Sequence, residues 1–162
     1  MQVRTPSESL VVMTEIVLPQ HTNPLQTIFG GVILSWIDIA ATICAQRHCQ
    51  AMVVTASLDT MNFLAPIRLG WIVNIAASVN YVHSTSCEIG VRIIAENPQT
   101  QEHFHTASAY LTMVALDSNG KPRKMPGLKP ESEIEKKRFQ AAAERRELRL
   151  KLRNKQIKGV VA

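Results

Sequence analysis

The chain has 162 residues, of which 46% are hydrophobic and 19% charged, a composition typical of one soluble domain with a sizeable core. Its net charge of +5 is uneven, because residues 1–120 hold 4 Lys and Arg against 8 Asp and Glu, whereas residues 121–162 hold 14 against 5. The basic charge therefore belongs to the tail, which argues against a nucleic-acid-binding face on the domain.

One strand, one long helix and four further strands are predicted, in that order. Residues 9–18 are rich in β-branched side chains and predict the first strand, and two prolines place residues 19–25 in a loop. Apolar residues fill 28–45 and predict a helix enclosed by protein on nearly every side, ended by the polar run 46–50. The other four strands are predicted over residues 51–63, 71–82, 87–95 and 104–116.

The short connections between the last four strands predict an antiparallel sheet. The single apolar helix has to pack against one face of this sheet, so the expected class is α+β, a curved sheet wrapped around a central helix. Because one helix leaves the other face and the edges of the sheet uncovered, we expect the chain to form oligomers.

A basic C-terminal tail, residues 129–162, follows the domain, which we place at residues 1–128. Residues 130–155 are rich in Ala, Glu, Lys, Arg and Leu, and Ser132 followed by Glu135 forms a capping box, so they predict a helix. A charged helix of this kind usually lies solvated on its own domain or on a neighbouring subunit. A contact with nucleic acid or acidic lipid is the less favoured alternative.

Targeting and redox features indicate the cytoplasm. The first ten residues lack the apolar run of a secretory signal, and no uninterrupted apolar run of about 18 residues predicts a membrane span. The three cysteines, Cys44, Cys49 and Cys87, are odd in number and lack CxxC spacing, which disfavours a disulfide framework and a zinc site.

Asp38 is the single charged residue of the apolar helix. An unpaired buried carboxylate is costly, so an acid in this position is a candidate catalytic group. Gly31, Ser35 and Thr42 share one stripe of the helix with it, because residues three, four or seven apart lie on one helical face. A structural hydrogen-bond acceptor and a solvated residue on a narrow exposed edge are the alternatives.

The start of the predicted helix is suited to stabilising a developing negative charge. Gly30 and Gly31 let a ligand approach the backbone, and the first N–H groups of a helix have no partner within it. Asn23, in the preceding loop with His21, could donate to a carbonyl oxygen, although a turn-forming asparagine is the simpler interpretation. With Asp38, these groups outline a hydrolytic site.

Other candidate sites rest on weaker patterns. His103 and His105 share one face of a strand and could form a metal pair, but we expect ordinary edge residues. The run KPRK at residues 121–124 could bind a phosphate or simply be solubilising. The chain has neither a P-loop nor a GxGxxG motif, so a nucleotide-hydrolase or dinucleotide-binding role lacks support.

Three stretches follow one another in the order and spacing of a known family: HTNPLQTIFGGVILSWID, VVTASLDTMNFLAPIRLG and DSNGKPRKMPGLKPESEIEKKRF. With them the chain resembles the hotdog-fold acyl-CoA thioesterases, in particular the bacterial YciA-type enzymes and the cytosolic acyl-CoA hydrolases of animals. The resemblance covers residues 9–140. It implies a five-stranded antiparallel sheet curled around one long helix, in subunits that pair edge to edge and often assemble as hexamers, trimers of dimers.

The resemblance also implies catalytic roles. Asp38 matches the catalytic aspartate, which acts on water as a general base or attacks the thioester itself. Asn23 matches the partner asparagine, contributed across the dimer interface. The N–H groups of Gly30 and Gly31 would polarise the thioester carbonyl.

Further positions are implied for substrate binding. Thr55 and Asp59 match positions that line the site from the neighbouring subunit, and an apolar tunnel for the acyl chain would have Met61, Trp36 and Phe63 as candidate walls. The positions that match CoA-binding residues of the family are Ser84, Thr85, Ser86, Arg123 and Lys124. The chain departs from the family pattern at Trp71, commonly an aspartate, and at Ser84, frequently a basic residue.

The implied activity is hydrolysis of fatty acyl-CoA to free fatty acid and CoA, with a dimer as the smallest active unit and a hexamer as the expected assembly. No metal or other cofactor is expected, because a thiolate is a good leaving group and CoA is part of substrate and product. The alternative is a non-catalytic acyl-CoA-binding or sensing protein on the same fold. A hotdog dehydratase, a third possibility, requires a histidine–acid pair near the helix start, where His21 is the only nearby histidine.

Overall fold

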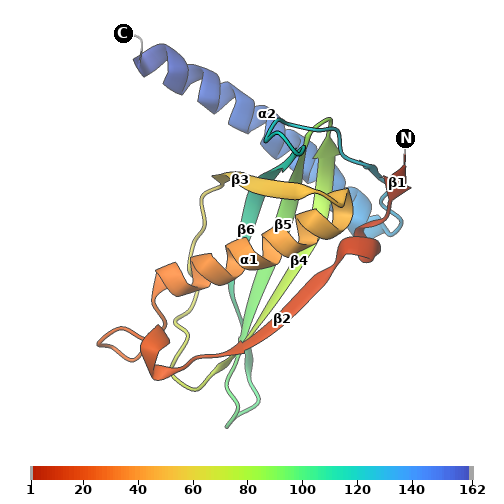
Figure 1. Ribbon diagram of the computed structural model, residues 1–162. Helices are drawn as coiled ribbons and strands as arrows, with labels where there is room; N and C mark the ends of the chain where they lie inside the picture. Colours follow the sequence, from red (N-terminus) through yellow and green to blue (C-terminus); the bar gives the residue numbers. More distant parts are fainter. Residues whose placement is uncertain (1, 161–162) are drawn as a thin grey trace.

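The computed structural model of the chain describes residues 2–160. A five-stranded antiparallel sheet curls around one long helix, α1 (Gly30–Cys49), as Figure 1 shows. The strands lie across the sheet in the order β2-β4-β5-β6-β3. Their bounds are Val11–Ile16 for β2, Ile72–His83 for β4, Ser86–Glu96 for β5, His103–Leu116 for β6 and Met52–Leu58 for β3. This arrangement confirms the predicted α+β class.

The core lies between the inner face of the sheet and one face of α1. Alternate residues of the central strands point inward, since side chains alternate between the two faces of a strand. Full burial of each large aliphatic side chain contributes about 1.5–3 kcal/mol to the stability of the fold. The fully buried aliphatic side chains of this layer include Ile33, Ile37, Val73, Ile75, Val79, Ile89, Ile93 and Leu111.

Two predicted boundaries of the inner layer were wrong by four residues or more. Strand β3 ends at Leu58 and not at Phe63, because Met61 packs against the core and Phe63 against the start of α1 after the chain has left the sheet. Helix α1 continues to Cys49, four residues beyond the predicted end, since His48 and Cys49 are buried. Gln50, in the left-handed conformation at φ 50°, ends the helix.

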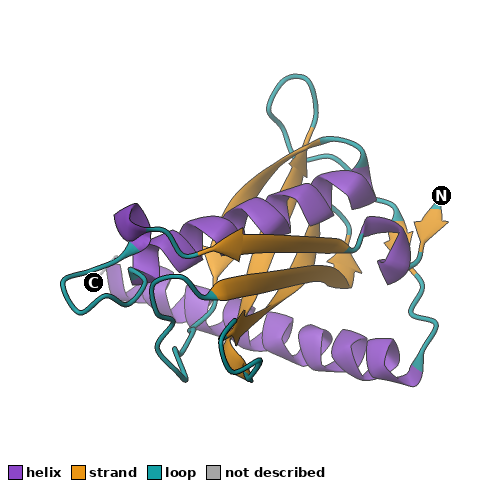
Figure 2. Ribbon diagram, turned by 90° about the horizontal axis from the view of Figure 1, so that it is seen from below, coloured by secondary structure: helices purple, strands orange, loops and turns teal. Residues whose placement is uncertain are grey.

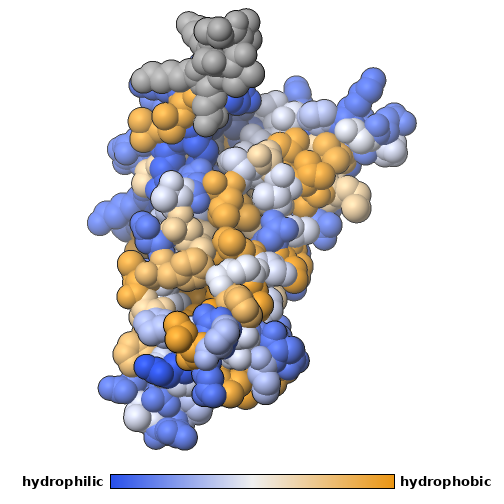
Figure 3. All heavy atoms as spheres, turned by 90° about the vertical axis from the view of Figure 1, so that its left-hand side faces the viewer, coloured by the Kyte–Doolittle hydropathy of each residue, from blue (hydrophilic) through white to orange (hydrophobic). Residues whose placement is uncertain are grey.

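The expectation that α1 is enclosed on nearly every side is also wrong for the chain by itself. The helix face that carries Asp38 is exposed, together with Leu34 and Ile39. The neighbouring edge strand β3 exposes apolar side chains as well, Met52, Val54 and Leu58. Figure 3 shows apolar side chains gathered across the middle of the molecule's side toward the start of α1 and the end of β3. Apolar composition alone does not tell whether a helix face is covered by its own chain or by another.

A second long helix, α2 (Glu133–Val160), covers the outer face of the sheet. Figure 2 shows the sheet between α1 and α2, so the domain has three layers. The predicted capping box is confirmed, because Ser132 Oγ accepts from Glu135 N–H and the Glu135 carboxylate accepts from Ser132 N–H. Ala142 of α2 is fully buried on the sheet, so this helix is only partly solvated. None of the helices in the described part of the chain is long and apolar enough to span a membrane.

The remaining elements are short and were not predicted. Strands β1 (Val3–Arg4) and β7 (Gly127–Leu128) form a parallel pair, and two 3-10 turns span Pro6–Ser9 and Pro19–His21. Two-residue strands have no alternation that a sequence pattern could show. The β1–β7 pair joins the N-terminal residues to the segment that leads into α2.

Candidate active site

Asp38 lies on the exposed face of α1 and accepts a hydrogen bond from a side chain of the neighbouring strand β3. The hydroxyl of Thr55 donates to Asp38 Oδ1 at 2.6 Å. A hydrogen bond to an ionised carboxylate is stronger than one between neutral groups, and it fixes the rotamer of the acid. Both are predicted site residues, but Thr55 was expected to line the site from the neighbouring subunit, whereas here it donates to Asp38 of its own chain. Ser35 and Gly31, on the same stripe, are also exposed, and Thr42 is half-buried.

Helix α1 begins without a side-chain cap. Phe29 occupies the N-cap position and contributes no side-chain hydrogen bond to the helix start. The N–H groups of Gly30 and Gly31 donate to no acceptor among residues 2–160. These two donors carry the positive end of the helix dipole and are available to a carbonyl oxygen. A Cβ placed on Gly31 would have no neighbour within 4 Å, so the space beside it is open in the single chain.

An apolar groove of about 340 Å³ opens beside this helix start. Its lining is Thr27, Ile28, Gly30, Phe63, Leu64, Ala65, Pro66 and Ile67. The ring of Phe63 packs on Gly30, where an added Cβ would lie 3.4 Å from the ring. The groove therefore offers apolar surface directly next to the two free N–H groups.

Asn23 uses its side chain within its own turn. Its Oδ1 accepts from the N–H of Leu25 at 2.9 Å and of Thr27 at 3.2 Å, and its Nδ2 donates to Thr27 Oγ1 at 2.9 Å. His21 of the same loop accepts from the N–H of Leu18 through Nδ1, and its ring packs edge-on against Trp36. The single chain thus shows the turn-forming role of Asn23, and its catalytic role stays a prediction.

The residues predicted to hold CoA lie together in the fold. The β4–β5 hairpin turn meets the end of β6 and the segment after it through two backbone bonds, from Ala115 N–H of β6 to Thr85 O and from Met125 N–H to Ser84 O. Ser86 begins β5 beside them, and the side chains of Arg123 and Lys124 are exposed. Two exposed cations in a segment that is hydrogen-bonded to a hydroxyl-rich turn suit a phosphate, but CoA binding by these residues remains a prediction.

Two further predicted pocket residues follow β3. Met61 is half-buried and packs against the core. The carboxylate of Asp59 accepts a hydrogen bond of 2.7 Å from Arg149 of α2, so it already has a partner within its own chain. Whether Asp59 also lines a pocket with a neighbouring subunit stays a prediction.

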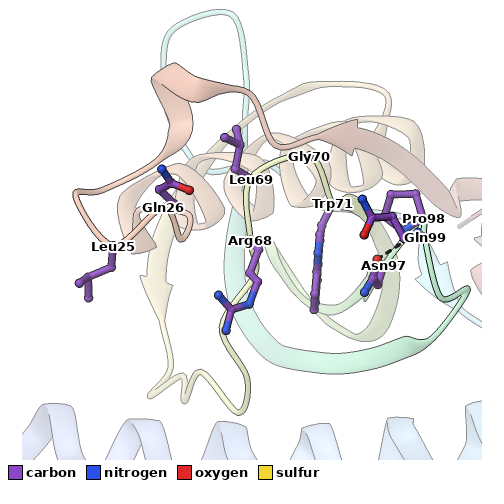
Figure 4. A pocket seen from close by; sticks show the side chains of 9 residues that line it. All are labelled: Leu25, Gln26, Arg68, Leu69, Gly70, Trp71, Asn97, Pro98 and Gln99. Atoms are coloured by element: carbon purple, nitrogen blue, oxygen red, sulfur yellow. Dashed lines mark hydrogen bonds between the residues drawn. The ribbon is translucent and has the colours of Figure 1, made fainter.

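A second hollow, about 430 Å³, has neither Asn23 nor Asp38 in its lining. It is lined by Leu25, Gln26, Arg68, Leu69, Gly70, Trp71, Asn97, Pro98 and Gln99. Figure 4 shows Trp71 between Arg68, which comes from the same loop, and the side chains of Asn97 and Gln99. Arg68 is the one ionisable side chain of this lining, so the hollow lacks the pair of groups needed for acid–base chemistry.

His103 and His105, for which a metal pair was the less expected alternative, both lie on strand β6. His105 Nε2 lies 2.9 Å from Ser108 Oγ on the sheet surface. Within the part of the chain that the structure describes, no group of three His, Cys, Asp or Glu side chains could hold a metal ion. The three cysteines are free and buried, and burial raises the pKa of Cys44 to about 12.

The spacing along α1 decides how these groups can act together. At a rise of 1.5 Å per residue, Asp38 lies about 12 Å further along the helix axis than Gly30. A base and an oxyanion donor that act on one carbonyl each have to lie about 3 Å from the reacting atoms. Asp38 and the helix start of one chain are therefore too far apart to serve the same thioester.

Comparison with known proteins supports a thioester hydrolase. Residues 25–102 match the model of the thioesterase superfamily. An uncharacterized acyl-CoA thioester hydrolase of Bacillus subtilis is 44% identical over 134 residues, 83% of this chain and 78% of that protein. The acyl-CoA hydrolase of Staphylococcus aureus, solved in complex with butyryl coenzyme A, coenzyme A and coenzyme A disulfide, superposes with a TM-score of 0.89 at 37% identity over 99% of both chains. A hexameric acyl-CoA thioesterase in its apo form superposes at 0.90 with 38% identity over 93% of this chain and 97% of that one.

Three variants of the Staphylococcus aureus enzyme, also solved, carry alanine in place of an asparagine, an aspartate and a threonine. Along that enzyme's chain the three residues follow one another in the same order and at the same separations as Asn23, Asp38 and Thr55 do along this one. The predicted family and its fold are confirmed by the superfamily match, the identity and the superpositions. The chain belongs to the hotdog-fold acyl-CoA thioesterases.

Proposed function

We propose that the chain hydrolyses acyl-CoA thioesters at a site composed of two subunits. The observation that supports this proposal most directly is the position of Asp38. Its carboxylate lies on an exposed face of α1 and accepts a hydrogen bond of 2.6 Å from the Thr55 hydroxyl. Because the free N–H groups of the same helix lie about 12 Å away along the axis, the oxyanion donors for this carboxylate have to come from a second copy.

The proposed reaction uses Asp38 as a general base. The carboxylate takes a proton from water, and the water oxygen attacks the thioester carbonyl, whose electron pair moves onto the carbonyl oxygen. The N–H groups at the helix start of the neighbouring copy stabilise this oxyanion. When the carbonyl re-forms, the carbon–sulfur bond breaks, and the CoA thiolate receives the proton that Asp38 had taken. Direct attack by Asp38, which forms a transient anhydride, is the alternative route.

The second copy is proposed to bind at β3 and the adjoining face of α1. Edge strand β3 has unpaired backbone groups on its outer side, and Met52, Val54 and Leu58 are exposed along it. An exposed apolar face of this kind marks an interface. Pairing across it would cover Leu34 and Ile39 of α1 and bring Asp38 of one copy toward Asn23 and the helix start of the other. The relative solved as a hexamer supports a trimer of such dimers.

Substrate binding is proposed at two places. The apolar groove at Phe63 suits the acyl chain, since it lies directly beside the N–H groups of Gly30 and Gly31. Arg123 and Lys124, exposed beside the β4–β5 turn, suit the phosphates of CoA. We propose the cytoplasm as the location, which the three free, buried thiols support. We further propose that the reaction uses no metal or cofactor.

Thiol release from a panel of acyl-CoAs, short to long, tests the function. The wild-type chain is compared with Asp38→Asn and with Glu144→Gln, a matched removal of one carboxylate on the exposed face of α2. We expect Asp38→Asn to lose at least a hundredfold in kcat while it still binds CoA, and Glu144→Gln to retain activity. Wild-type chain that binds acyl-CoA without releasing thiol would instead support the non-catalytic sensor. Label in Asp38 after a single turnover in ¹⁸O-water would establish the anhydride route with water attack on the Asp38 carbonyl, because general-base catalysis places the label only in the fatty acid.

A further inference from the structure

A buried carboxylate joins α2 to the sheet. Glu88 of β5 points to the outer face and is 2% exposed. Its two oxygens accept from Arg145 Nη2 at 2.6 Å and Nε at 3.2 Å, and from Arg149 Nη1 at 2.9 Å. Arg145 also stacks on Tyr110, 3.8 Å above the ring centroid. A buried acid needs such partners, because an unpaired charge away from water is strongly destabilising.

The strand beside Glu88 is shaped to complete this cluster. Asn80 lies at a bulge in β4 and donates from Nδ2 to Glu88 Oε1 at 3.2 Å. Its carboxamide occupies the space above Gly90, where an added Cβ would overlap the amide nitrogen. Glu88 therefore has donors from both sides, Asn80 on the sheet and the two arginines on α2.

Arg149 has a second partner that Arg145 lacks. Its Nη1 donates to Asp59 Oδ2 at 2.7 Å as well as to Glu88 Oε2. The side chains of Arg149 and Asp59 are 20% and 21% exposed, so this ion pair is shielded from bulk water on most sides. Asp59 directly follows β3, the strand that holds Thr55 against Asp38.

The chain from Asp59 to Leu64 is held at its two ends. Asp59 N–H donates to Tyr110 O, and Leu64 N–H donates to Thr106 O. The four residues between them make no backbone hydrogen bond with the described part of the chain. Two of the four are Met61 and Phe63, and Phe63 packs on Gly30 at the mouth of the apolar groove. The position of Phe63, which lines the groove, therefore depends on how firmly Asp59 and Leu64 are fixed.

We propose that Arg149 is a positioning residue for the acyl groove: by binding Asp59 and buried Glu88 together, it fixes segment 59–64 and thereby the place of Phe63. The inference rests on the proposed hydrolase function. Arg149 touches neither Asp38 nor the helix start, so it acts on substrate fit through Asp59 and not on the chemical step. Helix α2 is thus part of what defines the acyl groove, although it lies on the opposite face of the sheet.

Arg145 provides the comparison that separates positioning from stability. Both arginines satisfy Glu88, but only Arg149 reaches Asp59. A purely structural role of Arg149 would make Arg149→Gln resemble Arg145→Gln, with lower stability and an unchanged ratio of activities across acyl chain lengths. A positioning role makes Arg149→Gln resemble Asp59→Asn instead, a substitution that keeps size and removes the charge.

The test measures kcat and KM over the acyl-CoA panel for Arg149→Gln, Asp59→Asn, the double variant and Arg145→Gln. Lys151→Gln removes the same charge from an exposed position of the same helix and is the matched control. We expect KM to rise about tenfold for the preferred chain length in both Arg149→Gln and Asp59→Asn, with kcat nearly unchanged, because ground-state fit is what is lost. The double variant should be no worse than either single one, since both remove one interaction. Arg149→Lys, which keeps the charge, should recover part of the loss.

Hydrogen exchange supplies a readout that does not depend on activity. The amide of Leu64 should exchange faster in Arg149→Gln and Asp59→Asn, while amides of α1 stay as in Lys151→Gln. The proposal is overturned if KM, chain-length profile and Leu64 exchange in Arg149→Gln equal those of Lys151→Gln, or if Arg145→Gln reproduces the whole pattern. A wild-type chain without thioesterase activity refutes the proposed function, and faster Leu64 exchange in the two variants would still establish the link from α2 to segment 59–64.

Discussion

The composite site predicts that two inactive variants restore each other. One chain carries Asp38→Asn, which removes the base, and the other carries Gly30→Pro, which removes an oxyanion donor. Proline suits the first position of a helix, and Phe29, with φ −63° and ψ 133°, already has the extended conformation required before a proline. Each variant alone forms dimers in which both sites lack one group.

The magnitude follows from the distance along α1. Because Gly30 and Asp38 of one chain are about 12 Å apart along the axis, each site in the proposed arrangement combines the base of one copy with the helix start of the other. In a mixed dimer one site then contains both substitutions and the other contains none. Random pairing of equal amounts makes half of the dimers mixed, so about a quarter of the wild-type activity should return.

The assay is thiol release after the two variants are unfolded together, mixed in equal amounts and refolded, with each variant refolded alone for reference. A second mixture, Asp38→Asn with Thr55→Val, is the control, because both substitutions remove groups from the same half of the site and no intact site can form. Activity of the first mixture at the level of its parents would refute the two-subunit site. Recovery in the control mixture would refute the assignment of Thr55 and Asp38 to one half.

Three further predictions concern single groups. Thr55→Val should lower kcat by about tenfold to a hundredfold with little change in stability, since a hydrogen bond to a charged group is lost, and unchanged kcat would exclude a role of Thr55 in holding Asp38. Gly90→Ala should destabilise the fold by about 1–3 kcal/mol in urea unfolding, because the new Cβ overlaps the Asn80 amide, and Asn80→Ala combined with it should recover part of the loss. Burial raises the pKa of Cys44 from 9.0 to about 12, so the folded state keeps its proton more firmly than the unfolded state. Stability from this thiol is fully present below pH 9.0 and should be lost as the pH rises toward 12; reaction with a thiol reagent at pH 8 before unfolding would contradict the burial.

Local patterns in the sequence predicted the elements that build the inner layer. The apolar run that became α1 and the alternating runs that became β4, β5 and β6 each have a periodicity set by their own residues. Asp38 and the glycine pair were found because a charge and two small residues interrupt that run. The end of β3 was missed, because Met61 and Phe63 continue an apolar alternation after the regular pairing with β6 has ended at Leu58.

Contacts between segments far apart along the chain could not be predicted from the sequence. Glu88 and its arginines are 57 and 61 residues apart, so no local pattern links them, and α2 was expected to be a mainly solvated helix. An acid between apolar neighbours of a strand, and two arginines four residues apart on a helix, were the available signals. The exposed face of α1 was missed for a related reason, since apolar side chains suit a subunit interface as well as a core.

The separation between Glu88 and its arginines also affects the order in which the chain is assembled during synthesis. Strand β5 is made 57 and 61 residues before the two side chains that neutralise its buried acid, about 3 to 12 seconds at a translation rate of roughly 5–20 residues per second. During that interval Glu88 keeps its hydration on the uncovered outer face. The layer between the sheet and α1 can form from residues already made, whereas the outer layer closes only after Arg149 has been added. Folding of this chain on the ribosome is therefore expected to proceed from the inner layer to the outer one.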